Sequence, residues 1–513
     1  MAVAAFWFTE TAAADDTRIV EISSGHIAGD SIGNVDRFMG VPYAAPPVGE
    51  LRWRAPQAVQ AWSGVRSARA VASACAQYGN FFASADDTTF DKPYGSEDCL
   101  YLNVWAPKTA DKARPVLVFF HGGSGFAGNA AHPFYDGAQL AEQLDAVVIT
   151  TNYRLGVFGS LQSTALHTGD ALEASGNFYL LDLIRVLDWT KENCRSFGCD
   201  GSNITIAGHS AGAVIVLALL RSPLAKGKFH KAISLSGVPF SGSMTVAYER
   251  TTKLLTSLLI RDGSAADQKE AEKLLLKKSP VALREYLYRQ PMQVLVEASG
   301  RGLTPVAVSD GAVLQKLENP DKPAPVAVSQ VPLLIGKTRN ELSTLIPLFG
   351  PAAKMADMWP YYSGETVQRS PGNKMGWFDR LKRRAAVAFV GRYLNWKFDD
   401  FVGQYAAQLP AVFVYQFEWD NYPEPWRSDL GAAHGLDVPF IFGNFIDDQE
   451  IYMRFAWTTA NREEREALHR NMAGSLRAFL RFDSSAEPHR LDEAWRSWKD
   501  SSYIRVWGGA AAR

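Results

Sequence analysis

Short apolar runs alternate with helical patterns along most of the chain. The runs lie at 115–120, 146–153, 204–208, 231–237, 332–336 and 412–419. Their continuous apolar character is typical of strands buried on both faces. Residues 178–193 carry apolar side chains near helical spacing, and the charged amphipathic stretch 266–288 is typical of the surface. The alternation predicts an α/β fold with a mostly parallel central sheet flanked by helices.

The chain shows no internal repeat, heptad run or low-complexity linker that would divide it. We therefore expect residues 15–513 to form one α/β domain with long insertions. Residues 1–14 contain a short apolar run, 2–8, and an Ala-Ala-Ala segment, 12–14, that resembles a signal-processing site, but they lack a basic leader. We interpret them as the remnant of an export signal; an ordinary frayed terminus is the alternative.

Composition and charge exclude some classes of function. With 47% hydrophobic and 21% charged residues, the chain has enough apolar area for a large core. Lys and Arg total 53 against 54 Asp and Glu, so no overall positive field attracts nucleic acid. The longest strongly apolar run, 211–220, is about half of the roughly 20 residues that a membrane span needs. We expect neither a nucleic-acid partner nor a membrane span.

The four cysteines fall into two local pairs, Cys75 with Cys99 and Cys194 with Cys199. This pattern fits two disulfides in an oxidising compartment and agrees with export, which predicts a secreted or periplasmic protein. Four buried thiols in a cytosolic protein remain the alternative, since Cys194 and Cys199 are close enough in sequence to be neighbours without a bond.

A G-x-S-x-G motif supplies the strongest chemical signal. The segment Gly208-His209-Ser210-Ala211-Gly212 follows an apolar run and precedes the helical residues 213–220. In such a strand–turn–helix context the serine projects above the sheet as a nucleophile, and the flanking glycines leave room for the tight turn. Ser210 is therefore the predicted nucleophile.

A serine nucleophile needs a histidine base, which in this architecture follows it in the chain after an intervening acid. Four histidines follow Ser210: His230, His434, His469 and His489. His230 comes too soon to leave room for an acid loop. His469 lies in a polar helical pattern and His489 in a charged stretch, so we expect both to be solvated. His434, in the glycine-containing loop 431–435, is the predicted base.

The acid should lie on a loop after a core strand between these two residues. Glu341 meets this requirement, because it follows the apolar run 331–336 within a short polar segment. Asp310 and Asp437 are alternative carboxylates near plausible loops. We predict a Ser210–His434–Glu341 triad.

The glycine-rich segment Gly122-Gly123-Ser124 follows another core strand. Its backbone N–H groups, with that of Ala211, can stabilise a developing oxyanion. The preceding His121 is interpreted as part of the loop rather than as a metal ligand, because no second His or Cys stands at ligand spacing. No metal site is expected.

From about Val20 to Trp507 the sequence resembles the type-B carboxylesterase and cholinesterase family of α/β-hydrolases. The resemblance rests on these segments: Phe38-Met39-Gly40-Val41-Pro42-Tyr43-Ala44, Leu51-Arg52-Trp53, Glu97-Asp98-Cys99-Leu100-Tyr101-Leu102-Asn103-Val104, Asn152-Tyr153-Arg154-Leu155-Gly156, and the stretch from Phe197-Gly198 to Gly212. It implies an α/β-hydrolase fold. The family's Ser, Glu and His fall on Ser210, Glu341 and His434, and its oxyanion glycines on Gly122, Gly123 and Ser124.

The sequence also departs from the family pattern. Ser124 replaces the third oxyanion glycine, His209 replaces the usual glutamate before the nucleophile, and Cys199 replaces a glycine. The 75–99 segment resembles the family's first disulfide loop but contains no tryptophan, so the cation-binding aromatic residue of cholinesterases is missing there. Choline esters are therefore unexpected as substrates.

The sequence predicts a serine carboxylesterase that hydrolyses small-molecule esters through an acyl-enzyme without a cofactor. Amides, lactones and carbonates are alternative substrates. Lys337 and Arg339, beside Glu341, suggest a second possibility, polycarboxylate esters such as the tricarballylic esters cleaved by fumonisin esterases of this family; surface solvation of both residues is the alternative interpretation, and the one we favour. A cholinesterase-like binding protein without a working site is a third, although such proteins lack the full Ser, Glu and His set. The motifs leave the natural ester and the oligomeric state open.

Overall fold

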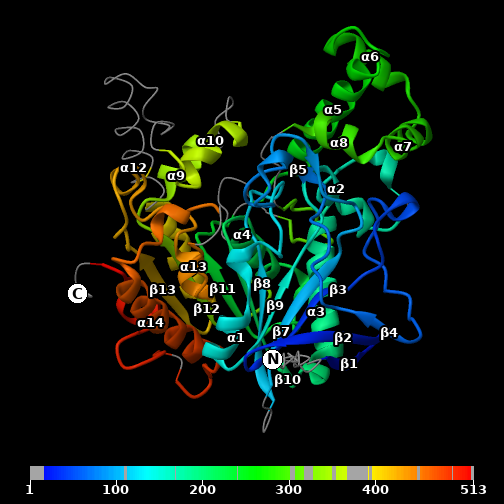
Figure 1. The fold of residues 1–513 in the computed structure, drawn as a ribbon. Coiled ribbons are helices and arrows are strands. Elements are labelled where there is room, and N and C mark those ends of the chain that lie inside the picture. Colours follow the sequence, from blue (N-terminus) through cyan, green and yellow to red (C-terminus); the bar gives the residue numbers. More distant parts are fainter. Residues whose placement is uncertain are drawn as a thin grey trace, which may run out of the picture.

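The computed structural model describes residues 17–108, 113–167, 169–239, 241–300, 307–316, 327–348, 354–366, 391, 396–447, 451–487 and 489–509. The segment interpreted as an export-signal remnant, 1–14, lies outside these residues. The central sheet runs in the order β1-β2-β3-β7-β9-β8-β10-β11-β12-β13-β14 (Figure 1). Its strands are β1 (Arg18–Ile22), β2 (Gly25–Ile32), β3 (Val35–Pro42), β7 (Tyr101–Pro107), β8 (Arg114–Phe120), β9 (Val147–Thr151), β10 (Cys199–His209), β11 (Lys231–Leu235), β12 (Leu333–Thr338), β13 (Val412–Phe417) and β14 (Ile504–Trp507).

The sheet is parallel from β9 to β14 and antiparallel from β1 through β7 to β9. The short strand β4 (Val65–Ser67) pairs with β2, and β5 (Gln77–Tyr78) pairs with β6 (Pro93–Tyr94) in a separate ribbon. The parallel strands β8 to β13 are those expected from the continuous apolar runs, whereas the edge strand β14 was not predicted and is largely exposed. β8, β9 and β11 are buried on both faces, and the mostly parallel sheet is confirmed.

Two apolar layers hold helices on opposite faces of this sheet. On β8, Val116 and Val118 pack in one layer with α3 (Phe178–Asn193) and α4 (Ala211–Leu220). Their neighbours Leu117 and Phe119 pack in the other layer with α1 (Ala138–Leu144), α13 (Asp437–Phe442) and α14 (Arg462–Leu480). Because successive side chains along a strand point to opposite faces of the sheet, each core strand contributes side chains to both layers. Helix α3 has the bounds that the apolar spacing predicts.

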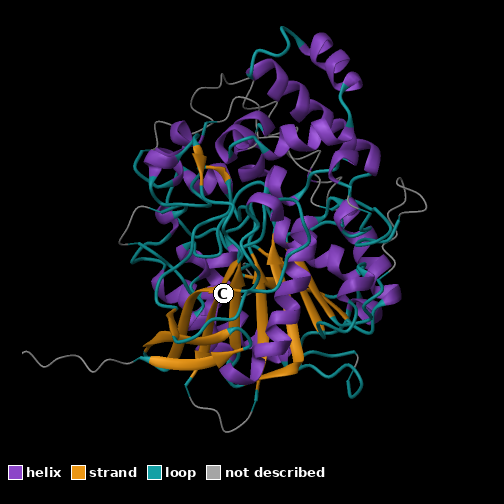
Figure 2. Cartoon of the chain, turned by 90° about the vertical axis from the view of Figure 1, so that its right-hand side faces the viewer, coloured by secondary structure: helices purple, strands orange, loops and turns teal. Residues whose placement is uncertain are grey.

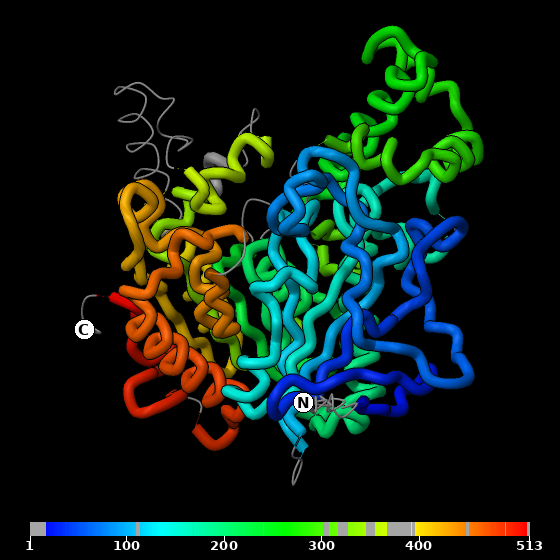
Figure 3. The backbone as a smooth tube through the Cα atoms, viewed as in Figure 1, coloured from blue at the N-terminus to red at the C-terminus, as the bar shows by residue number. Residues whose placement is uncertain are grey.

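Long insertions follow two of the core strands. Between β11 and β12 lie α5 (Met244–Arg261), α6 (Gln268–Lys277), α7 (Pro280–Tyr288) and α8 (Met292–Ser299), which stand out at the upper right of Figure 3. Between β12 and β13 lie α9 (Glu341–Leu348) and α10 (Met355–Tyr362). In Figure 2 the strands of the central sheet occupy the lower part of the molecule, and the short separate ribbon lies among the loops and helices above them. The stretch 266–288 forms two helices because Ser279 caps a new one at Pro280.

Both predicted cysteine pairs are bonded. Cys75–Cys99 joins residues 24 apart in the chain, and Cys194–Cys199 joins residues 5 apart. All four cysteines are buried. Within the described part of the chain, no helix combines the length and hydrophobicity that crossing a membrane requires.

Candidate active site

Ser210 lies in the turn between β10 and α4, at the carboxyl end of the parallel strands. Its backbone adopts φ 55° and ψ −118°, a conformation that is rare for residues with a side chain and marks a sharp turn. A Cβ atom on Gly208 would lie 2.3 Å from the carbonyl oxygen of Gly212, and one on Gly212 would lie 2.1 Å from that of Phe120. Both flanking positions of the motif therefore exclude larger side chains.

His434 lies between α12 (Trp426–Leu430) and α13, and its ring reaches Ser210 from above the sheet. The distance between His434 Nε2 and Ser210 Oγ is 2.9 Å. On the other side of the ring, Nδ1 is in hydrogen-bond contact with Glu341 Oε2. With the ring proton on Nδ1 facing the carboxylate, Nε2 is free to accept the hydrogen of the serine hydroxyl.

Glu341 is the first residue of α9, just beyond the end of β12. The backbone N–H of Thr338 donates to Glu341 Oε1 at 2.7 Å, and this bond orients the carboxylate. Burial alone would raise the pKa of Glu341, but the charge and hydrogen bond of His434 lower it below its usual range. Burial opposes protonation of His434, yet the Glu341 carboxylate holds the pKa of His434 above its ordinary value.

The alternative acids occupy other positions. Asp310 accepts hydrogen bonds from the backbone N–H groups of residues 312–314 and from Asn177, and so it shapes its own loop. Asp437 is fully buried at the start of α13, where Tyr415 donates to Oδ2 at 2.9 Å. Burial and the nearby Glu341 raise the pKa of Asp437 to about 6. Neither aspartate is hydrogen-bonded to His434, although the charge of Asp437 contributes to the raised pKa of His434.

The predicted oxyanion residues gather around Ser210. Gly123 has φ 113° and Ser124 has φ 56°, so the loop after β8 turns through left-handed conformations beside the nucleophile. A Cβ on Gly122 would lie 3.2 Å from Ser210 Cβ, which places this loop against the serine. Ala211 opens helix α4, where backbone N–H groups have no partner within the helix. Together these N–H groups can stabilise an oxyanion formed at Ser210.

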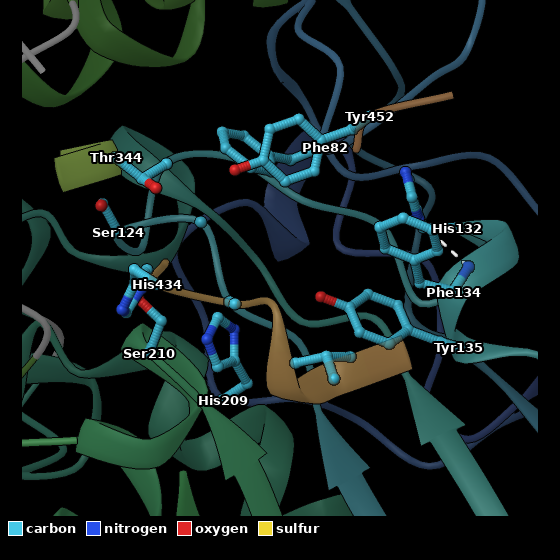
Figure 4. Close-up of a pocket in the computed structure, with 14 residues that line it drawn as sticks. Phe82, Ser124, His132, Phe134, Tyr135, His209, Ser210, Thr344, His434 and Tyr452 are labelled. Carbon is cyan, nitrogen blue, oxygen red and sulfur yellow. Dashed lines mark hydrogen bonds between the residues drawn. The ribbon is translucent and has the colours of Figure 1, made fainter. Parts of the chain in front are cut away.

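A pocket opens above these residues (Figure 4). Its described lining consists of Phe82, Gly122, Gly123, Ser124, His132, Phe134, Tyr135, His209, Ser210, Thr344, His434, Gly435, Val438 and Tyr452. None of these described residues is Lys, Arg, Asp or Glu. The sequence motifs did not indicate the aromatic side chains of this lining, Phe82, Phe134, Tyr135 and Tyr452. These residues come from separate segments, and the local sequence around each one resembles that of an ordinary core residue.

Lys337 and Arg339 have partners away from this pocket. The Lys337 ammonium lies 4.7 Å from the centre of the Phe398 ring. Arg339 is 43% exposed and pairs with Asp420 at 2.6 Å. Neither residue belongs to the described lining of the pocket.

The other histidines that follow Ser210 in the chain lie outside the site. His230 Nδ1 accepts the N–H of Ile204 at 3.1 Å, and His489 pairs with Asp500 at the surface. The expectation that His469 is solvated is wrong, since this residue is only 5% exposed. Its Nδ1 bonds the carbonyl oxygen of Phe440 at 2.7 Å, because this face of α14 packs on α13. His121 stacks on Tyr153 and bonds the carbonyl oxygen of Gly122, consistent with a role in the loop.

Comparison with known proteins identifies relatives along nearly the whole chain. Residues 16–369 match the model of the carboxylesterase family. The chain is 31% identical to the para-nitrobenzyl esterase of Bacillus subtilis, with 94% of this chain and 93% of that protein covered. It is 35% identical to the fumonisin B1 esterase of Sphingopyxis macrogoltabida, over 84% of this chain and 76% of the relative.

Solved structures agree with the sequence relatives. A PNB esterase superposes with a TM-score of 0.73 at 28% identity, covering 96% of this chain and 95% of that one. A carboxylesterase of Geobacillus stearothermophilus gives a TM-score of 0.71 at 30% identity, covering 95% and 96%. Both structures therefore share the fold over nearly the whole length of this chain.

Proposed function

The chain belongs to the carboxylesterase family and is a serine carboxylic ester hydrolase, and we propose that Ser210, His434 and Glu341 are its catalytic residues. The observation that carries this assignment is the continuous hydrogen-bonded chain from Ser210 Oγ through the His434 ring to Glu341. A hydroxyl next to a base whose other nitrogen is held by a carboxylate is the arrangement that activates serine.

Acylation begins when an ester carbonyl lies beside Ser210 Oγ. Nε2 of His434 removes the hydroxyl proton as the oxygen attacks the carbonyl carbon, and negative charge moves to the carbonyl oxygen. The N–H groups of Gly123, Ser124 and Ala211 stabilise this oxyanion, and Gly122 gives the loop its approach to Ser210. His434 then returns the proton to the leaving alcohol, which breaks the ester bond and leaves an acyl-serine.

Deacylation repeats these steps with water. His434 removes a proton from water, the resulting hydroxide attacks the acyl carbon, and the proton passes back to Ser210 Oγ as the acid departs. Glu341 fixes the tautomer of His434 and stabilises the imidazolium that forms twice in each cycle. These steps draw every proton from the protein or from water, so the proposal includes no cofactor.

The test combines substitution with covalent labelling. Ser210→Ala should abolish hydrolysis of p-nitrophenyl esters while leaving the circular dichroism spectrum unchanged. An organophosphonate should label the wild type with one equivalent at Ser210, as read by peptide mass spectrometry. Stoichiometric labelling of another residue, with activity retained in Ser210→Ala, would remove Ser210 from this role.

The uncharged lining favours neutral esters with an apolar or aromatic group. Phe82, Phe134, Tyr135 and Tyr452 offer rings, and the described lining holds no cation for an acyl group with free carboxylates. The fumonisin B1 esterase is nevertheless among the relatives, so polycarboxylate esters form the second candidate class. Comparing kcat/KM for p-nitrophenyl butyrate, a p-nitrophenyl ester with a free carboxylate and a tricarballylate ester separates the two classes.

We also propose that residues 15–513 act as one hydrolase unit that works in a secreted or periplasmic setting. The unit is supported by the two apolar layers, each of which includes residues from both halves of the chain. The setting is supported by the disulfides Cys75–Cys99 and Cys194–Cys199, which persist in oxidising compartments. Cell fractionation of the source organism with an antibody to the chain would test the location.

A further inference from the structure

His209 precedes the nucleophile at the end of β10, and its ring packs against the proposed base. The ring centroids of His209 and His434 are 4.7 Å apart, with planes inclined at 40°. The residue is 7% exposed, and its Nε2 has no hydrogen-bond partner among the described residues. Figure 4 shows the ring beside Ser210 and His434 at the base of the pocket. A buried ring nitrogen without a hydrogen-bond partner among the described residues requires an explanation.

Two glycines make room for this ring. A Cβ on Gly122, in the oxyanion loop, would lie 3.0 Å from His209 Nδ1. A Cβ on Gly435, directly after His434, would lie 3.2 Å from His209 Cε1. Both separations are shorter than ordinary van der Waals contacts. The His209 ring therefore fills the space between the oxyanion loop and the loop that carries His434.

The surroundings keep this ring uncharged. Burial lowers the pKa of His209 well below its ordinary value, the nearby His434 lowers it further, and Glu341 opposes both effects. The groups that act electrostatically on His434 itself are Glu341 and Asp437. The oxyanion loop and the turn after His434 pack on His209 through Gly122 and Gly435, which carry no side chain. A glutamate at position 209, the usual residue of the family, would add a carboxylate beside the base.

We propose that His209 is a positioning residue for His434: its neutral ring holds the His434 ring against Ser210 and keeps a further carboxylate away from the base. The proposal rests on the assignment of Ser210 and His434 as nucleophile and base. It concerns packing and charge around His434 and assigns His209 no proton transfer.

The test compares four variants at position 209 by the pH dependence of kcat and kcat/KM for p-nitrophenyl butyrate. His209→Phe keeps a ring of similar width without charge, so kcat should stay within about threefold of the wild type. His209→Ala removes the ring, and loss of His434 alignment should lower kcat between about tenfold and a hundredfold with little change in KM. For His209→Gln we expect a kcat between those of the Phe and Ala variants. The acid limb of its pH profile, where activity is lost as His434 becomes protonated, should not shift.

His209→Glu tests the charge. A carboxylate about 5 Å from the imidazole should raise the apparent pKa of the acid limb by about one unit or more. His469→Gln, which replaces a buried histidine away from the pocket, is the matched control and should keep the limb in place. Near-ultraviolet circular dichroism and thermal melting establish that each variant is folded.

Each outcome decides one part of the proposal. Positioning by the ring would be overturned by either of two results. One is a wild-type kcat in His209→Ala, and the other is a decrease in kcat in His209→Phe as large as that in His209→Ala. An unshifted acid limb in His209→Glu would overturn the electrostatic role. If His209→Ala does not fold, His209→Phe still tests positioning by the ring and His209→Glu still tests the electrostatic role. Phosphonate labelling of Ser210 in the same preparations keeps these outcomes separate from a failure of the Ser210 assignment.

Discussion

The side chains of Glu341 and His434 are hydrogen-bonded although 93 residues separate them in the chain. Glu341 follows β12 and His434 follows β13, and these strands are parallel neighbours from Leu333 paired with Val412 to Thr338 paired with Phe417. The carboxyl ends of both strands therefore lie at one edge of the sheet, next to the turn at Ser210. Strand order brings the proposed acid and the proposed base together.

Replacing Glu341 by Gln tests this contact. The amide keeps the shape of the carboxylate but cannot stabilise the imidazolium and does not enforce its tautomer. The equivalent Asp→Asn change in a serine protease costs about 10⁴ in turnover, and we expect kcat to fall by a comparable order. Asp310→Asn is the control and should retain most of the activity, because Asp310 bonds its own loop. A nearly fully active Glu341→Gln variant would reassign the acid and leave Ser210 and His434 in place.

The pH dependence follows from the base. The proposed mechanism needs neutral His434, and Glu341 holds the pKa of His434 above its ordinary value, so activity should be lost as the pH falls through an apparent pKa above about 6.5. The nearby Asp437 contributes to this elevation. Asp437→Asn should therefore move the acid limb to lower pH while keeping most activity on the alkaline plateau. Profiles of kcat/KM from pH 5 to 9 would show both effects; a limb that moves upward in this variant would contradict them.

The fold was predictable wherever one strand or helix carried its own signal. The continuous apolar runs predicted β8 to β13, and the apolar spacing of residues 178–193 predicted α3. Helix α14 shows where local pattern fails. Its polar sequence suggested a solvated helix, yet His469 and Met472 are buried because α14 packs on one face of the sheet beside α1 and α13. Which face of a polar helix is covered depends on tertiary packing.

The site was predictable as far as it depends on local motifs and chain order. Ser210 was predicted from its turn, and His434 and Glu341 from loops that follow core strands; the structure brings these three side chains into hydrogen-bond contact. The pocket was not, because Phe82, Tyr135 and Tyr452 come from distant loops that only the folded chain brings together. The partners of Lys337 and Arg339 also became visible only in three dimensions. Their position beside Glu341 in sequence did not indicate that both point to other groups.

The disulfides offer a matched pair for a stability measurement. In the chain-entropy model, removing Cys75–Cys99 from a loop of this length lowers the free energy of unfolding by about 3 kcal/mol. Cys194–Cys199 closes a much shorter loop, so its removal should cost about 1 kcal/mol less. Urea unfolding of the two double-alanine variants compares them. The expectation would be contradicted if both variants lost the same free energy of unfolding. It would also be contradicted if Cys75 and Cys99 could be alkylated in the native protein without reductant.

The buried ion pair between Arg154 and Asp182 allows the sharpest prediction about the scaffold. The two side chains are 3% and 0% exposed, and Arg154 Nη2 donates to Asp182 Oδ1 at 2.6 Å. The backbone N–H of Arg154 also donates to Asp182 Oδ2, so the carboxylate anchors the loop after β9 to helix α3. Asp182→Asn removes the negative charge and leaves the guanidinium buried without its counterion. This change should lower the free energy of unfolding by about 3–5 kcal/mol.

The double variant Arg154→Met/Asp182→Asn separates the cost of an unpaired charge from the value of the pair. It removes both charges, keeps an amide oxygen that can accept the backbone N–H of residue 154, and fills the place of the arginine with an unbranched apolar chain. We therefore expect the double variant to be more stable than Asp182→Asn by about 1 kcal/mol or more, since the uncompensated charge is gone. Urea unfolding of the wild type, both single variants and the double variant completes the cycle. If the two single losses add in the double variant, Arg154 and Asp182 contribute independently, and their contact does not account for the stability of this loop.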